Sequence, residues 1–498
     1  MRVRSSGIFL PVFCLPSRFG IGDLGPEAYR FVDFLHESKQ HVWQVLPINP
    51  TQSAFGHSPY HNPSAFAFNP LLISPESMVE KGLLEQKDLG GPPSFPADRV
   101  DYSSAAQYKE NLFDLAYARF RQGRPDPEYT HFCTRNADWL QDFALFTALG
   151  ERFNGQSWSR WPEDIRNRNP RALIDCAQEL SEKISRIQFL QYIFYSQWVS
   201  LKRYCRAKGV HVFGDIPIYI PYDSADTWAH PDFFELDEAR NPYVVSGVPP
   251  DYFSETGQLW GHPLYRWETH RKRRYDWWAR RIEHNLDLFD YIRIDHFRGL
   301  VAYWEVPVHE KTAVNGRWME VPVVDFFDEM QRRFACLPIV AEDLGYITAD
   351  VREIMNRYQF PGMRLLVFGF AGDPVHNPNA PHNIQPNCVV YTGTHDTNTV
   401  RGWFEKETTE ADRQKIFGYL GRTLPADAIA QELVRLAMMS PANLAILPLQ
   451  DLLGLGAEAR LNRPSTTEGN WLWRVTESQL KGLSRDRLRE MTETYARG

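Results

Sequence analysis

The sequence has few cysteines for its length, and no two of them form a C-x-x-C pair. That spacing would be expected of a zinc site or a redox motif, and nothing else in the pattern suggests a disulfide framework. The six cysteines are Cys14, Cys133, Cys176, Cys205, Cys336 and Cys388. Isolated thiols in a large chain are typical of a reducing compartment.

Long apolar runs are also missing. No stretch approaches the roughly 18 consecutive apolar residues of a membrane-spanning helix. The first residues, MRVRSSGIFLPVF, become strand-like almost at once and leave no room for a cleavable signal peptide. We therefore expect a cytoplasmic protein that does not bind a membrane.

The chain has no excess of positive charge. It contains 55 Lys and Arg against 62 Asp and Glu, a formal net charge of −7. Proteins that bind nucleic acid usually carry a basic surface, so a nucleic-acid partner is not expected. One basic run, RKRRYDWWARR at 271–281, is expected to form a helix whose charges face solvent.

Signatures of several enzyme classes are absent. The sequence contains neither a G-x-x-x-x-G-K-[ST] phosphate loop nor a G-x-S-x-G nucleophile elbow. His296 follows Asp295 and His395 precedes Asp396, and neither pair has the helical i, i+4 spacing of a zinc site. The Asp and Glu residues lack the alternation of a calcium loop. We expect no metal site and no cofactor.

A short apolar, β-branched or aromatic run that ends in polar or acidic residues recurs along the chain. Helix-like segments, such as 26–39, 351–358 and 410–420, lie between several of these runs. The runs are GIFLPVF (7–13), HVWQVLPI (41–48), VHVFGDIPI (210–218), DYIRID (290–295), LPIVAED (337–343), GMRLLVFGF (362–370), CVVYTGTHD (388–396) and NLAILPLQD (443–451). Alternating strands and helices predict a parallel sheet, and eight such units predict an α/β fold of the (β/α)8 TIM-barrel type.

Two intervals between these runs are too long to be bare loops. Residues 49–209 separate the second and third runs, and residues 219–289 separate the third and fourth. The first interval contains several helical patterns, the longest at 182–208. We expect a single catalytic barrel over 1–498 with large helical insertions between strands.

Acidic residues fall at the ends of four predicted strands. Asp215 ends the third, Asp295 the fourth and Glu342 the fifth, and Asp396 follows the seventh. Barrels of this type carry their reacting groups at the C-terminal ends of the strands, so these four acids should meet at one mouth. A pair of carboxyl groups, one ionised and one protonated, is what cleavage of a glycosidic bond requires.

A charged pair interrupts the fourth predicted strand. Arg293 and Asp295 are two residues apart, so both side chains should lie on the same face. A guanidinium would favour the carboxylate form of Asp295 and fix its orientation. A proton-holding Glu342 would need the opposite surroundings, namely burial or nearby negative charge. A structural ion pair is the alternative explanation, but the other strand-end acids favour an active site.

Three blocks carry a resemblance to a known family. RIDHFRG (293–299), VAEDLG (340–345) and GTHDTNT (393–399) resemble the catalytic blocks of the 4-α-glucanotransferases, also called amylomaltases or disproportionating enzymes, of glycoside hydrolase family 77. Further similar segments are LPSRFGIGDLG (15–25), SPYHNPSAFAFNPLLIS (58–74), FGDIPIYI (213–220), GVPPDYFSETGQLWG (247–261) and GNWLWR (469–474). The resemblance implies a cofactor-free retaining enzyme that transfers α-1,4-glucan segments between maltodextrins. Its oligomeric state is not visible in the sequence; a monomer is compatible with the absence of a heptad run.

The resemblance also implies residue roles. Asp295 is expected to be the nucleophile that forms a covalent glucosyl-enzyme, and Glu342 is expected to be the general acid/base. Asp396 is expected to bind sugar hydroxyl groups and to stabilise the transition state. Further residues are expected to contact the sugar or to hold the catalytic groups: Arg293, His395, His296, Asp215, Tyr60, Ser58, Asp251, Trp260, Asn462 and Pro464.

The segment 247–261 is rich in Gly and Pro at its ends and aromatic within. It could be a mobile lid that excludes water, or an ordinary surface hairpin. The resemblance implies a loop over the acceptor sites, with Trp260 stacking on glucose. The chain departs from the family pattern at Phe13 and Cys14, where small hydroxyl residues are more usual, and at His57, where Asp is common. An α-glucan hydrolase on the same scaffold and a non-catalytic glucan-binding protein remain alternatives.

Overall fold

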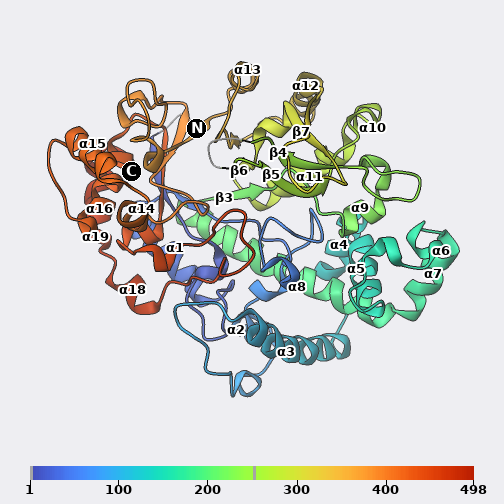
Figure 1. Ribbon diagram of the computed structural model, residues 1–498. Coiled ribbons are helices and arrows are strands. Elements are labelled where there is room, and N and C mark those ends of the chain that lie inside the picture. Colours follow the sequence, from blue (N-terminus) through green and yellow to red (C-terminus); the bar gives the residue numbers. More distant parts are fainter. Residues whose placement is uncertain (1–3, 251–253) are drawn as a thin grey trace.

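Eight parallel strands form the barrel in the computed structural model, which describes residues 4–250 and 254–498 (Figure 1). Their order is β10-β11-β12-β1-β2-β3-β6-β9. The strands are β1 (Ser5–Phe9), β2 (Val42–Gln44), β3 (His211–Ile216), β6 (Tyr291–Ile294), β9 (Ile339–Ala341), β10 (Gly362–Leu365), β11 (Cys388–Tyr391) and β12 (Leu444–Pro448). The N–H of Ala341 donates to the carbonyl of Pro361 at 2.9 Å, so the sheet nearly closes between β9 and β10. The (β/α)8 prediction is confirmed.

The barrel strands are buried on both faces. Every residue of β11 and β12 is buried, which explains why these segments read as continuous apolar runs. Gly214 in β3 lies against the ring of Phe289, where an added Cβ would be 2.3 Å from ring carbons. Close packing of this kind holds the end of β3, and with it Asp215, in a fixed place.

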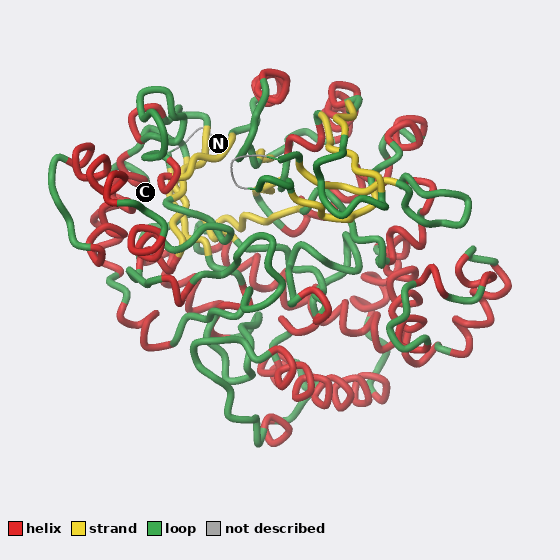
Figure 2. Tube along the Cα trace, in the orientation of Figure 1, coloured by secondary structure: helices red, strands yellow, loops and turns green. Residues whose placement is uncertain are grey.

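Helices surround the barrel, as Figure 2 shows. They are α1 (Pro26–Glu37), α8 (Ser181–Ala207), α11 (Asp276–Leu288), α12 (Val323–Arg333), α13 (Ala349–Tyr358), α14 (Val400–Lys406), α15 (Glu410–Leu420), α16 (Ala426–Met439), α17 (Leu449–Leu452), α18 (Glu477–Gly482) and α19 (Arg485–Thr494). The last helix packs against α1 and α16. Among the described residues, none of the helices combines the length and the apolar character needed to cross a bilayer.

The interval between β2 and β3 is largely helical, as expected. Its helices are α2 (Pro75–Glu80), α3 (Tyr102–Gln122), α4 (Pro127–Arg135), α5 (Ala137–Arg152), α6 (Glu163–Arg166) and α7 (Pro170–Glu179), before α8 leads into β3. In Figure 1 they lie below and to the right of the barrel. The single-domain organisation over 1–498 stays a prediction.

A second sheet, which the sequence analysis did not predict, lies beside the barrel mouth. Its four antiparallel strands have the order β5-β4-β7-β8. They are β4 (Val244–Val248), β5 (Gln258–Pro263), β7 (Ala302–Pro307) and β8 (Arg317–Glu320), and the short helices α9 (Ala225–Ala229) and α10 (Trp267–Lys272) precede and follow the β4–β5 pair. The described parts of the segment 247–261 contain the end of β4 and the first residues of β5, which pair in antiparallel fashion. The interval 219–289, expected to be helical, contains half of this sheet.

The basic run at 271–281 does not form one helix, so that part of the prediction is wrong, but residues 271–274 are exposed as expected of a solvated face. Arg274 and Tyr275 have φ values of 52° and 55°, and this left-handed turn separates α10 from α11. Arg271 and Arg280 pair with Asp325 and Asp138, and Arg281 is buried. The charges of residues 271–274 therefore face solvent, and only that of Arg281 lies in the core.

Candidate active site

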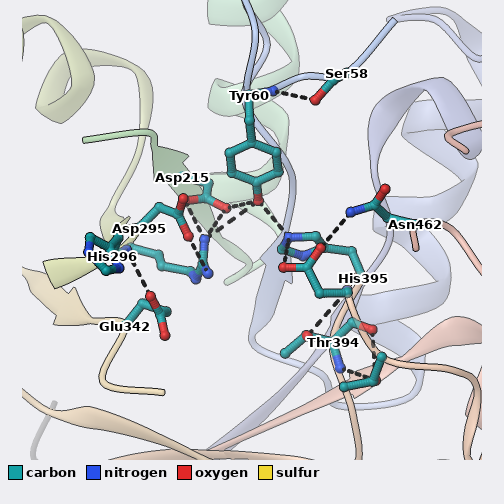
Figure 3. A network of polar contacts seen from close by, with 12 residues as sticks. Ser58, Tyr60, Asp215, Asp295, His296, Glu342, Thr394, His395 and Asn462 are labelled. Carbon is teal, nitrogen blue, oxygen red and sulfur yellow. Dashed lines mark hydrogen bonds and ion pairs between the residues drawn. The ribbon is translucent and has the colours of Figure 1, made fainter. Parts of the chain in front are cut away.

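The barrel brings the four strand-end acids to one place, as Figure 3 shows for Asp215, Asp295 and Glu342. In the ladder between β3 and β6, Asp215 lies opposite Arg293. The N–H of Asp295 donates to Ile216 O at 3.0 Å, and the N–H of Glu342 donates to Ile294 O at 3.1 Å. The pairing therefore continues one residue beyond each strand. It places Asp295 and Glu342 on neighbouring strand ends, which lie about 4.8 Å apart in a sheet.

Arg293 links two of these acids inside the barrel. Its side chain is only 3% exposed. Nη1 donates to both oxygens of Asp215, at 2.8 and 2.9 Å, and Nη2 donates to Oδ1 of Asp295 at 2.7 Å. Two opposite charges in a buried strand are tolerated because each is paired. The arginine holds the Asp295 carboxylate in one orientation and leaves its second oxygen outside this ion pair.

Glu342 lies in surroundings that favour its protonated form. Its two oxygens accept the backbone N–H groups of His296 and Leu344, at 2.8 and 2.7 Å. Burial, together with the negative charge of Asp295, outweighs these bonds and the charge of Arg293 and raises the pKa of Glu342 to about 8. At neutral pH this carboxyl group carries a proton and has a fixed direction.

Asp396 has the opposite character. Its side chain is 44% exposed. Oδ2 lies 3.3 Å from Nε2 of His395, and Oδ1 accepts a hydrogen bond from Asn462 at 2.7 Å. The surrounding protein disfavours the charged form, but His395 and Asn462 together hold the pKa of Asp396 well below its usual range. Two carboxyl groups of one site are thus kept in different protonation states.

Tyr60 joins the two halves of the site. Its hydroxyl donates to Asp215 at 2.6 Å and lies 2.9 Å from Nε2 of His395. Its ring lies between the Asp215 side and the His395 side in Figure 3. Burial and the charge of Asp215 raise the pKa of Tyr60 well above its usual value, so it stays a neutral donor. Ser58 accepts the backbone N–H of Tyr60 at 3.3 Å and shapes the loop.

His296 and Trp260 form one wall of the site. His296 has a left-handed backbone, with φ 49°, which turns its N–H toward Glu342. Its ring meets the Trp260 ring edge-to-face, with centroids 4.7 Å apart. Burial lowers the pKa of His296 to about 4, so the ring is neutral at pH 7. Asp251 lies outside the described residues.

One functional residue was missed by the sequence analysis. Arg460 donates to the backbone carbonyls of Asp396 and Asn462, at 3.1 and 2.7 Å, and pairs with Glu407. It holds the loop that carries Asn462 against the segment that carries Asp396. Only its closeness to Asn462 in the sequence could have pointed to it.

The departures from the family pattern lie in well-packed positions. Cys14 is fully buried, and the ring of His57 stacks on Tyr102 with centroids 4.0 Å apart. Among the described residues, no group of three or more His, Cys, Asp and Glu side chains is arranged to hold a metal ion.

Comparison with known proteins identifies the family to which the chain belongs. Residues 10–480 match the family described as 4-alpha-glucanotransferase, glycoside hydrolase family 77. Proteins of that name from Synechocystis sp. and Aquifex aeolicus are 46% and 44% identical over 99% and 95% of this chain, and over 98% and 96% of their own lengths. The amylomaltase from Streptococcus agalactiae, solved in complex with acarbose, has a TM-score of 0.95 at 37% identity and covers 99% of this chain and 100% of its own. Because the match is strong over the full barrel and over the segments that carry the acids, the chain belongs to the 4-alpha-glucanotransferases.

Proposed function

We propose that this protein transfers segments of α-1,4-glucan from a donor maltodextrin to the 4-hydroxyl of an acceptor glucan or glucose, by two displacements through a covalent glucosyl-enzyme. The observation that carries this proposal is the pair of neighbouring carboxyl groups with opposite surroundings. Arg293 holds the Asp295 carboxylate. Glu342 has a pKa of about 8, so it is protonated at neutral pH. Retaining glycoside chemistry needs one carboxyl group of each kind.

In the first displacement, a carboxylate oxygen of Asp295 attacks the anomeric carbon of the donor. The bond from that carbon to the glycosidic oxygen breaks, and Glu342 gives its proton to this oxygen, so the shortened chain leaves as an alcohol. The ionised Asp396 accepts hydroxyl donors of the same sugar and offsets positive charge that develops on the ring.

In the second displacement, Glu342, now ionised, takes the proton from the 4-hydroxyl of an acceptor. The acceptor oxygen attacks the anomeric carbon and displaces Asp295. Two inversions restore the α configuration. Glu342 serves as acid and then as base without moving, because the backbone N–H groups of His296 and Leu344 hold both of its oxygens.

Transfer must compete with hydrolysis, because water can also attack the glucosyl-enzyme. The β4–β5 hairpin brings Trp260 against His296, directly beside the nucleophile. We propose that this hairpin covers the acceptor sites, that Trp260 stacks on an acceptor glucose, and that an acceptor bound there displaces water. Asp251, which lies outside the described residues, is also proposed to contact the acceptor.

Incubation with pure maltotriose tests the function. A transferase produces glucose and a ladder of longer maltodextrins while the total of reducing ends stays constant. Rising reducing ends without longer products would identify a hydrolase. No change at all would favour a non-catalytic glucan-binding protein.

We further propose that the protein works as a monomer in the cytoplasm. The six cysteines, all within the described residues, are free thiols, and four of them are buried. Free thiols fit a reducing compartment. Size-exclusion chromatography with light scattering, and fractionation of cells, test the two parts.

A further inference from the structure

Two aromatic side chains and one arginine form a flat platform outside the catalytic cluster, and we call Trp318, Arg298 and Tyr346 the rim platform. The guanidinium carbon of Arg298 lies 3.8 Å from the centre of the Trp318 ring and 6.0 Å from that of Tyr346. Trp318 is 37% exposed and Tyr346 is 73% exposed. Single exposed aromatics are ordinary, but two that flank one arginine make a patch.

The rim platform is continuous with the catalytic strand ends. Arg298 belongs to the short 3-10 helix η7 (Phe297–Leu300), three residues after Asp295, and Tyr346 follows Glu342 by four residues. The N–H of Phe297 donates to the carbonyl of Glu342 at 3.2 Å. Arg298 Nη1 donates to Tyr346 O at 3.3 Å and to Thr348 Oγ1 at 2.7 Å. The segments after the nucleophile and after the acid/base are thereby tied together.

The second sheet supplies the rest of the geometry. Trp260 is on β5 and Trp318 is on β8, the two edge strands of the sheet. Three strand spacings separate these edges, about 14 Å. Trp260 contacts His296, and Trp318 lies against Arg298. The two tryptophans therefore contact the segment 296–298 from opposite edges of the second sheet.

We propose that Trp318 and Tyr346 form an outer glucan-binding subsite on the side of the leaving and acceptor chain, reached only by chains longer than maltotriose. The side follows from Glu342, which protonates the leaving oxygen and is followed by Tyr346 in the chain. The inference rests on the proposed function, because it takes a glucan to be the occupant.

The chemistry of the rim platform suits such a chain. A glucose ring presents flat faces of C–H groups, and these faces pack well against an aromatic ring. The hydroxyl groups of the sugar can donate a hydrogen bond to the Tyr346 hydroxyl or accept one from it. Arg298 stacks on the Trp318 ring and donates to the backbone carbonyl of Tyr346, so the Trp318 ring and the backbone at Tyr346 are held before the ligand arrives. A rigid platform loses little conformational entropy on binding. The rim platform therefore selects donors and acceptors by their length.

Binding to a non-reacting enzyme tests the proposal independently of transfer. Calorimetric titration of Asp295→Asn protein gives affinities for maltoheptaose and maltotriose, and Tyr346→Ala and Trp318→Leu are added to it separately and together. Leu at 318 keeps an apolar contact for Trp304, whose ring lies 5.2 Å away. Tyr419→Ala is the matched control, because Tyr419 on α15 is also 37% exposed and also stacks on a neighbouring ring.

Each platform variant should lower the ratio of maltoheptaose to maltotriose affinity by about five-fold, as expected for the loss of one aromatic contact, while Tyr419→Ala leaves the ratio unchanged. An unchanged ratio in both platform variants would overturn the subsite, as would an equal loss for the two sugars. Failure of the proposed function would look different, because the unmodified enzyme would then not elongate maltotriose at all.

Discussion

At the residue scale, the site depends on carboxyl groups that the fold keeps in different states. Arg293 holds Asp295, His395 and Asn462 hold Asp396, and burial beside Asp295 keeps a proton on Glu342. The same residue type thus serves as nucleophile, charge stabiliser and acid because its neighbours differ.

Asp295→Asn removes the nucleophile while keeping its shape. We expect turnover of maltotriose to fall at least about 10⁴-fold, because no covalent intermediate can form. Glucan binding should persist, since the amide preserves the volume and can still contact Arg293. Steady-state assays and calorimetry measure the two effects. Activity within ten-fold of the unmodified enzyme would show that another group is the nucleophile.

The pKa of Glu342 sets the expected alkaline limit of activity. Its pKa of about 8 means that the acid form is present at neutral pH and is lost as pH rises through 8. The value of kcat/KM for maltodextrins should therefore fall by about ten-fold for each unit above that pH, which a pH profile measures.

Glu342→Gln checks that assignment. With α-maltosyl fluoride, whose leaving group needs no proton, release of fluoride in the first turnover should survive in the variant and should lose the alkaline decline. With maltotriose, the variant should be slower by about 10²-fold or more. Full activity of Glu342→Gln on maltotriose would contradict the role.

At the element scale, the turn between α10 and α11 aims a buried arginine at the end of β3. Arg281 donates from Nη1 to the carbonyl of Ile218 at 3.2 Å and from Nη2 to that of Pro217. Its guanidinium also lies over Trp277 and Trp278, 5.5 and 5.1 Å from the ring centres. These carbonyls follow the strand that carries Asp215, so α11 supports the floor of the active site.

Arg281→Met should lower the free energy of unfolding by about 3 kcal/mol, because the buried carbonyl of Pro217 loses its charged donor and that of Ile218 keeps only the Tyr265 hydroxyl. Arg280→Met is the matched control. Arg280 is the adjacent arginine, its side chain is 35% exposed, and its ion pair with Asp138 should contribute less than about 1 kcal/mol. Urea unfolding measures both. Equal losses in the two variants would show that Arg281 does not support β3.

The second sheet shows where sequence patterns give little information. β8 is short and mostly exposed, with the residues RWME. β4 pairs with β7, which lies more than fifty residues later in the chain. Pairing between such distant segments depends on how the barrel strand β6 places them, and no local pattern records it.

At the scale of the whole molecule, Arg497 links the first strand of the barrel to the end of α16. The buried side chain of Arg497 donates to Ser5 O at 2.9 Å, to Met438 O at 2.6 Å and to Ser440 O at 2.9 Å. It joins the start of β1 to the end of α16.

Arg497→Ala should lower the free energy of unfolding by about 3 kcal/mol, since three carbonyls lose a charged donor. Arg489→Ala serves as the control, because Arg489 is exposed and its ion pair with Asp486 lies on the surface. Chemical unfolding followed by circular dichroism measures the loss. Equal stability of the Arg497→Ala and Arg489→Ala variants would contradict the role of Arg497.

The sequence by itself determined the barrel and the positions of its acids. Eight buried strands leave eight apolar runs, and strand-end chemistry leaves Asp215, Asp295, Glu342 and Asp396 at the ends of such runs. The blocks around these acids also carried the family resemblance. These features are local in the chain, so they can be read from it.

Only the tertiary structure decided how those residues act. The raised pKa of Glu342 and the lowered pKa of Asp396 come from burial and from neighbours far away in the chain, such as Asn462. The break at Arg274, the burial of Arg281 and the meeting of Trp318 with Arg298 likewise depend on packing. Electrostatic and packing free energies depend on distances in space, and a linear sequence specifies those distances only through the fold.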